Sequence, residues 1–122
     1  MNERLRPLLF DAEVLADTAN GDSALLQDLV EIFLRIVPPM TTRLRHALET
    51  SQFTVIAEET HGLRSCLAMI GATKLDTRCR EMEIAARRSI GDTMDDALCA
   101  DIEQLIGDVY EYHAASLRNI AR

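Results

Sequence analysis

Apolar residues recur at steps of three and four along four long stretches of this 122-residue chain. That spacing places them on one face of an α-helix, where they form a stripe that must be buried against another element. The four predicted stripes, in chain order, are Leu26, Leu29, Phe33, Ile36, Met40, Leu44 and Ala47; Ile56, Thr60, Leu63, Leu67 and Ile70; Leu75, Cys79, Met82, Ala86 and Ile90; and Leu98, Ile102, Leu105, Val109, Tyr112 and Ser116.

Residues that begin or end helices separate the stripes. We expect Asp11 to cap a short helix from Ala12 to about Ala19, and Asp22 or Ser23 to cap the first long helix. Asn20-Gly21 tolerates positive φ and so ends the short helix.

The first long helix should continue to about Glu49, but with a kink or a short break at Pro38-Pro39, because proline removes a helical hydrogen bond. The second long helix is expected from about Phe53 to Ile70, and Gly71 should stop it.

Thr73 is a plausible cap for the third long helix. The last break is expected at Gly91-Asp92-Thr93, and the last helix should run from about Met94 to Asn119.

These elements predict an all-α fold, an antiparallel up-down-up-down four-helix bundle with a short N-terminal capping helix. The chain is the length of one domain, which we assign to residues 1–122. Aromatic residues make up only 4% of the chain, and there are only five glycines and three prolines. An all-β fold needs many turns and favours aromatic residues in its strands, so this composition argues against one.

The net charge of −7 makes the chain a poor match for nucleic acid, whose phosphates attract basic surfaces. The charge is uneven, because residues 40–88 carry eight basic and six acidic side chains, so the middle of the chain could face an acidic partner. We find no signal peptide, no membrane span and no CxxC pair among three cysteines, and we expect a cytoplasmic monomer. The initial Met and the full set of helices favour a free-standing protein.

His61 is the side chain most suited to chemistry. Relative to the stripe that contains Thr60 and Leu63, it points away from the core, whereas His46 and His113 have no feature that separates them from surface or packing histidines. Helical geometry predicts that small or polar residues and one cation share its exposed face: Ala57, Glu58, Gly62, Arg64, Ser65 and Ala68. No phosphate-binding loop or metal-ligand spacing accompanies it.

The segment from Thr60 to Cys66, followed by Ile70-Gly71-Ala72, resembles the histidine phosphotransfer (HPt) domains of multistep two-component phosphorelays. The family pattern is roughly His-x-Leu-Lys-Gly-Ser, followed by an aliphatic residue, Gly and a small residue. The resemblance extends over about residues 8–90, while the last helix is generic. Two positions depart from the pattern: Arg64 replaces the usual Lys, and Ser65 replaces the usual Gly.

The resemblance implies a phosphocarrier and not an enzyme. His61 would accept a phosphoryl group from the aspartate of a response-regulator receiver domain and pass it to another receiver, and a hybrid sensor histidine kinase would be a further partner. Arg64 would offset the phosphoryl charge. Mg²⁺ is expected on the receiver, so the chain itself would need no cofactor or metal.

Two other functions stay open. Because Ser65 departs from the family pattern, the chain could instead be a helical adaptor, or a degenerate HPt-like module, that binds a receiver without transferring phosphate. An enzyme with its site in the bundle core is a third class, although the apolar stripes contain no carboxylate and no cluster of histidines.

Overall fold

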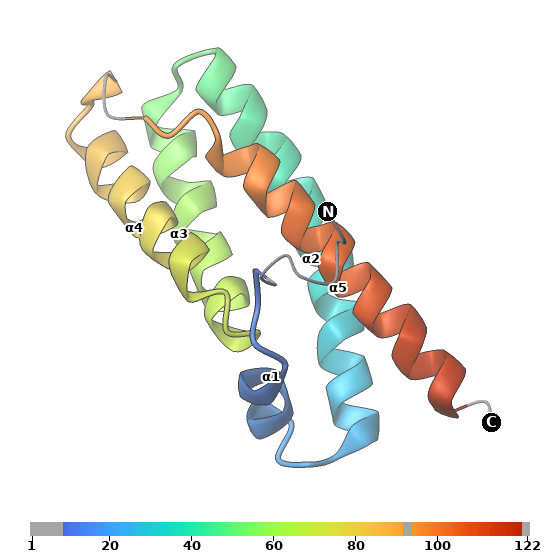
Figure 1. Ribbon diagram of the computed structural model, residues 1–122. Coiled ribbons are helices and arrows are strands. Elements are labelled where there is room, and N and C mark those ends of the chain that lie inside the picture. The colour runs from blue at the N-terminus through green and yellow to red at the C-terminus, as the bar shows by residue number, and fades with distance from the viewer. Residues whose placement is uncertain (1–8, 92–93, 121–122) are drawn as a thin grey trace, which may run out of the picture.

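The structure, a computed structural model, describes residues 9–91 and 94–120. They form five helices and, within those ranges, no strand (Figure 1). The helices are α1 (Ala12–Thr18), α2 (Ser23–Glu49), α3 (Phe53–Met69), α4 (Thr73–Arg87) and α5 (Leu98–Ile120). Asp92 and Thr93 of the predicted last break, and residues 1–8 and 121–122 of the predicted domain, lie outside the described residues.

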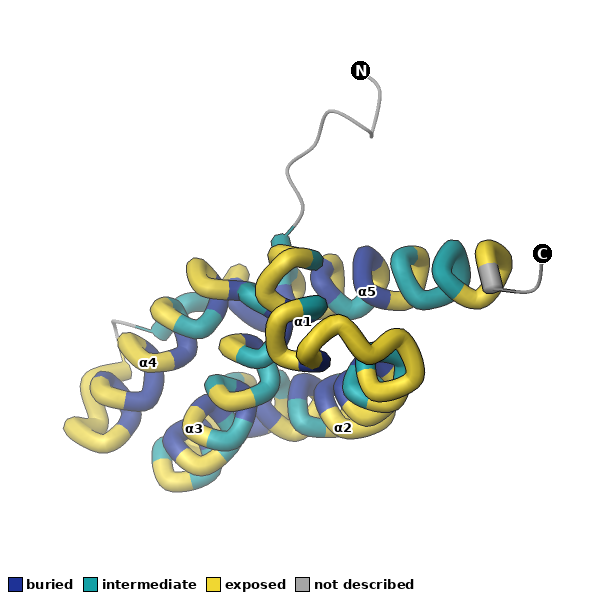
Figure 2. Tube along the Cα trace, turned by 90° about the horizontal axis from the view of Figure 1, so that it is seen from below, coloured by how far each residue is buried: buried dark blue, intermediate teal, exposed yellow. Residues whose placement is uncertain are grey.

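The four long helices form the predicted bundle. Helix α2 packs against α3 and α5, and α4 packs against α3 and α5, with the most extensive contact between α3 and α4. The apolar stripes meet in one core, while the outer faces of the helices are exposed (Figure 2). In the described part of the chain, no helix combines the length and the apolar character needed to cross a membrane.

Helix α1 lies across the end of the bundle formed by the start of α2 and the α3–α4 turn (Figure 1). Its predicted cap is confirmed, because the Asp11 side chain accepts a hydrogen bond of 2.9 Å from the Glu13 N–H. Asn20 and Gly21 end this segment with φ of 54° and 74°, and Asp22 caps α2. The sequence therefore predicted this end of the molecule correctly.

The proline pair does not break α2. The helix is uninterrupted from Ser23 to Glu49 with Pro38 and Pro39 inside it, so of the two expected outcomes the short break is wrong, and the kink stays a prediction. Packing against α3 on one side and α5 on the other holds the segment helical despite the two missing N–H donors.

The buried face of α2 also differs from the predicted stripe. Phe33, Leu44 and Ala47 are buried as expected, but Ile36 is 38% exposed and Val37 takes the core position beside it. Both residues are apolar, so periodicity did not distinguish them. The packing of α2 against α3 and α5 determines that Val37, and not Ile36, faces the core.

The stripe of α3 is confirmed, since all five of its predicted residues, Ile56, Thr60, Leu63, Leu67 and Ile70, are buried. In α4 the predicted stripe is buried up to Ala86. Ile90 is exposed, because Ser89 adopts φ 55° and the helix ends at Arg87. Thr73 is the first residue of α4 and not its cap, which is Ala72.

Gly71 permits the close approach of α1 to the α3–α4 turn. It adopts φ +72°, and a Cβ atom there would lie 2.7 Å from the Asp11 Cβ. The Asp11 N–H donates to the Ile70 carbonyl at 2.9 Å, which fixes the entry of α1 against this turn. The glycine expected to stop the helix thus also makes room for another segment.

Helix α5 begins at Leu98, four residues later than predicted. Asp95 occupies the approach to the helix, where its side chain accepts from the Ala97 N–H at 3.2 Å and pairs with Arg78 of α4 at 2.7 Å. Tyr112 and Ser116 of the predicted stripe are only half-buried.

Candidate functional site

His61 lies in the middle of α3, and its side chain is 68% exposed. Glu58, Ser65 and Ala68 are exposed on the same side of the helix, as their spacing of three and four residues predicts. A partner surface could therefore reach the imidazole across this outer face of α3.

Two of the predicted neighbours do not belong to that face. Ala57 is buried, with 3% of its surface exposed, because it packs against the core between α3 and α4. Gly62 is half-buried and faces α2, where a Cβ atom would lie 2.6 Å from the Met40 Cε. Steps of 100° per residue place both positions near the edge of the face, and the neighbouring helices cover that edge.

The imidazole is held by a carboxylate from the next helix. The Nδ1 atom of His61 lies 3.1 Å from Oε2 and 3.3 Å from Oε1 of Glu83 on α4. Glu83 is buried, with only 8% of its surface exposed. A carboxylate only accepts hydrogen bonds, so Nδ1 must be the donor and its proton is fixed there.

Glu83 is itself held by Arg87, one turn along α4. The Nη2 and Nε atoms of Arg87 donate to Glu83 Oε2 at 2.8 and 3.0 Å. Burial alone would raise the pKa of Glu83, but the hydrogen bonds and positive charge of Arg87, with His61, lower it below its ordinary value. The carboxylate is therefore ionised at neutral pH.

Arg64, the cation expected beside His61, turns toward α4. Its Nε atom donates to Asp76 Oδ1 at 2.9 Å, and its Nη1 atom lies 3.9 Å from Glu83 Oε1. The guanidinium stays near the site, with 36% of the side chain exposed, but in this structure two carboxylates attract it.

With the proton on Nδ1, the lone pair of Nε2 is available on the exposed side of the ring. An exposed, neutral imidazole with a fixed tautomer can act as a nucleophile toward an electrophile brought by another molecule. Within residues 9–91 and 94–120, no three His, Cys, Asp or Glu residues gather closely enough to hold a metal ion.

Sequence reasoning missed Glu83 and Arg87 as parts of the site. A signal for Glu83 was present, since His61 and Glu83 lie eleven residues on either side of Ala72, near which the α3–α4 hairpin turns. Folding the two antiparallel helices about that turn brings the two positions opposite each other.

The other histidines differ from His61. His46 is exposed near the end of α2, and its side chain has no ion pair within the described residues. The Nε2 atom of His113 lies 3.6 Å from Glu31 Oε1, and only 13% of that histidine side chain is exposed.

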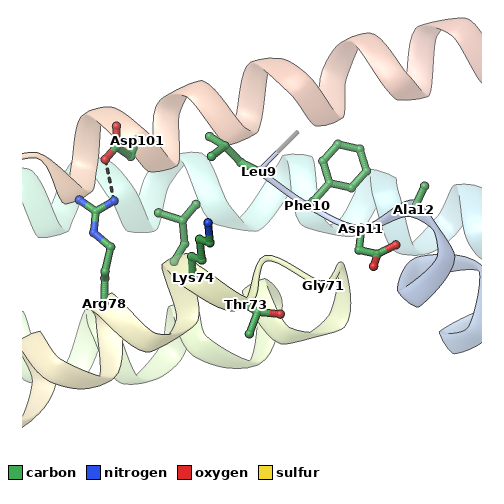
Figure 3. Close-up of a pocket in the computed structure, with 10 residues that line it drawn as sticks. Leu9, Phe10, Asp11, Ala12, Gly71, Thr73, Lys74, Arg78 and Asp101 are labelled. Atoms are coloured by element: carbon green, nitrogen blue, oxygen red, sulfur yellow. Dashed lines mark hydrogen bonds and ion pairs between the residues drawn. The ribbon is translucent and has the colours of Figure 1, made fainter. Parts of the chain in front are cut away.

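A cavity of about 690 Å³ lies elsewhere (Figure 3). It is bounded by the segment before α1, the α3–α4 turn, α4 and α5, and Arg78 pairs with Asp101 at one side of it. His61 does not line it, so the exposed imidazole belongs to an open surface.

An apolar strip on α2 borders the outer face of α3. Ile32 and Ile36 are 37% and 38% exposed. Met40, one turn after Ile36, meets Gly62 of α3, which places the strip on the α3 side of α2. The surface around His61 thus combines charged groups toward α4 with apolar groups toward α2.

Two comparisons with known proteins gave a match. The family model described as Hpt domain matches residues 28–112, which extends farther into the last helix than the resemblance seen in the sequence. Among solved structures, the chain is similar to the crystal structure of histidine-containing phosphotransfer protein B (HptB) from Pseudomonas aeruginosa PAO1. The TM-score is 0.73 at 22% identity, over 89% of this chain and 95% of that one. No protein with a curated description matches.

The structural likeness shows a shared fold, and the family model covers well over half of the chain, including the histidine-bearing helix α3 and the α4 helix that supplies Glu83. On this evidence the chain belongs to the Hpt domain family, whose members are phosphotransfer carriers in phosphorelays.

Proposed function

We propose that this Hpt domain carries the phosphoryl group on Nε2 of His61, which accepts it from the aspartate of one receiver domain and passes it to the aspartate of another. The observation that carries the proposal is the contact between His61 Nδ1 and the ionised Glu83 carboxylate at 3.1 Å. In the neutral ring that contact places the proton on Nδ1, so Nε2 keeps its lone pair.

The proposed transfer is a displacement at phosphorus. The Nε2 lone pair of His61 forms a bond to the phosphorus atom, and the bond from phosphorus to the aspartyl oxygen breaks. The electron pair of that bond returns to the aspartate as a carboxylate. No proton needs to leave His61, because Nδ1 keeps its proton against Glu83 throughout.

As the product forms, the Nδ1–H group carries more positive charge, which the Glu83 carboxylate stabilises. Arg64 would meet the negative phosphoryl oxygens after leaving Asp76, with which it pairs at 2.9 Å. The receiver would supply the aspartyl phosphate and its Mg²⁺, so the chain needs no metal site of its own.

We propose the outer face of α3 together with the apolar strip on α2 as the surface for receivers. Glu58, Ser65 and Ala68 surround His61 on α3, and Ile32 and Ile36 would bury apolar area beside them. A hybrid sensor histidine kinase would supply one such receiver. A carrier of this kind would act as a monomer in the cytoplasm, shuttling between partners.

The direct test is labelling by phosphorylated receiver domains. We expect wild-type protein to gain an acid-labile, base-stable phosphate and His61→Gln to gain none. His46→Gln and His113→Gln serve as matched controls and should be labelled like the wild type. Equal labelling of His61→Gln, with phosphate on another histidine, would refute the assignment.

The same experiment separates the carrier from the adaptor that the sequence left open. A wild-type protein that binds receivers but takes phosphate from none of them would be a docking module. In that case phosphoramidate, a small phosphoryl donor that needs no docking, would show whether the imidazole itself is competent.

A further inference from the structure

Arg87 is part of neither the sequence pattern around His61 nor the transfer as proposed above, yet it makes the shortest contacts with Glu83. We propose that Arg87 is a positioning residue for His61: it holds the Glu83 carboxylate against Nδ1 and thereby keeps the proton of the neutral ring on Nδ1, so that Nε2 retains its lone pair. This inference deepens the proposed function and rests on it.

The contacts are asymmetric in a way that suits this role. Arg87 donates twice to a single oxygen, Oε2, at 2.8 and 3.0 Å, and that oxygen is also the nearer one to His61 Nδ1, at 3.1 Å. Two donors from one planar group, converging on the same oxygen, fix the position of that oxygen. The third donor, from His61, then meets an oxygen whose place is already set.

Arg64 cannot replace Arg87 in the geometry observed. Its Nε atom is occupied by Asp76, and its Nη1 atom is 3.9 Å from the other oxygen, Oε1, beyond hydrogen-bond distance. Without Arg87, the carboxylate would be drawn toward Arg64 and away from Nδ1. Among the described residues, the titratable and charged groups in contact with Glu83 are His61 and Arg64 from α3 and Arg87 from its own helix.

The exposure of the two partners supports positioning over simple stability. The Arg87 side chain is 57% exposed, whereas that of Glu83 is 11% exposed. The guanidinium is mostly solvated, so charge attraction alone stabilises the fold little at that end of the pair. The nearly buried carboxylate depends on the donors of Arg87, and it is the carboxylate that contacts the reactive ring.

The test compares Arg87→Gln with Arg88→Gln, which removes the same charge from the next residue. Arg88 is exposed, and within the described residues its side chain forms no ion pair. The first readout is the tautomer of His61 in unphosphorylated protein, from ¹⁵N chemical shifts of the imidazole as a function of pH. The second is the rate at which phosphoramidate phosphorylates His61.

In Arg87→Gln we expect the proton to redistribute from Nδ1 to Nε2 and the phosphorylation rate to fall about tenfold, as for other groups that orient a reactive histidine. Arg87→Lys keeps the charge but not the paired donors, and should restore part of both. Arg88→Gln should resemble the wild type. An unchanged tautomer in a folded Arg87→Gln protein would overturn the inference.

If circular dichroism shows that Arg87→Gln does not fold, Arg87→Lys becomes the test of the inference. A wild-type tautomer of His61 in Arg87→Lys would show that the paired donors of arginine are not needed, and would overturn the inference. The tautomer requires no phosphotransfer. A wild-type protein that no receiver phosphorylates, but whose His61 tautomer depends on Arg87, would contradict the proposed function and leave this inference standing.

Discussion

At the scale of single residues, the site depends on one carboxylate shared between two helices. Glu83 faces His61 from α4 and is ionised because Arg87 and His61 together outweigh its burial. Ser65 and Ala68 have no part in this pairing, since both are exposed one and two turns beyond His61. Substitutions at these two positions therefore probe the partner surface without disturbing the histidine.

We predict that Ser65→Gly stays folded and accepts phosphate from more receivers than the wild type. The Ser65 hydroxyl donates to the Gly62 carbonyl at 3.3 Å, so its loss removes one weak bond and a Cβ from the docking face. The helix-propensity loss is a few tenths of a kcal/mol. Time courses with one cognate and several non-cognate receivers measure the change, and an identical receiver profile would show that Ser65 is merely tolerated.

We predict that Ala68→Trp blocks transfer from receivers and leaves the fold intact, because Ala68 is exposed beside His61. Ala100→Trp is the control, since Ala100 is exposed on α5, which does not pack against α3. Transfer rates and helical content are the measurements. Phosphoramidate should label both variants, and loss of that labelling in Ala68→Trp would mean that the indole disturbs His61 itself.

At the scale of elements, two glycines have different roles, one within α3 and one in the α3–α4 turn. Gly62 lets α3 approach Met40 of α2, whereas Gly71 allows the turn that sets α4 against α3 and receives α1. The α3–α4 hairpin is the element that matters most for chemistry, because its register brings Glu83 opposite His61.

We predict that Gly71→Ala lowers the free energy of unfolding by about 2 kcal/mol, because alanine is strained at φ +72° and its Cβ would meet Asp11. Gly62→Ala should stay within about 0.5 kcal/mol of the wild type, because the gain in helix propensity offsets a shift of the flexible Met40 end. Urea unfolding measures both. Equal destabilisation of the two variants would contradict this assignment.

At the scale of the whole molecule, Arg78 connects three segments. It donates to Asp95 before α5 at 2.7 and 3.0 Å and to Asp101 within α5 at 2.6 Å. The hydrogen bonds with Arg78 hold the pKa of Asp95 below its ordinary value of 3.8. A lowered pKa stabilises the fold above the ordinary value, and that contribution is lost as the pH falls through the folded-state value.

We predict that Arg78→Gln lowers the free energy of unfolding by about 1 kcal/mol at pH 7, because two partly exposed carboxylates lose their partner. The difference from the wild type should shrink as the pH falls below the ordinary value of 3.8, because Asp95 then gains a proton on unfolding of the wild type. Arg80→Gln, an exposed position on the same helix, is the control. Urea unfolding at pH 7 and pH 3 tests this, and a constant difference would exclude the linkage.

The sequence alone was enough to predict the helices, the caps of the first two and the outward direction of His61, because these follow from local hydrogen bonding and from a periodicity of 3.6 residues. It did not predict the cap of α4 or the start of α5. Asp11, Asn20, Gly21 and Asp22 act as predicted at the first helix boundaries. To predict that His61 is exposed, it was enough to know that His61 lies off the buried stripe that contains Thr60.

The packing of neighbouring helices determines which edges of the exposed face around His61 are covered. Ala57 and Gly62 lie within one helical step of the face, and the burial of one and the contact of the other with Met40 arise from neighbouring helices. Packing also kept α2 helical through Pro38 and Pro39. The pairing of His61 with Glu83 depends on the register between α3 and α4. The apolar periodicity of each helix shows which face is buried but does not show which residues of the two helices lie opposite each other.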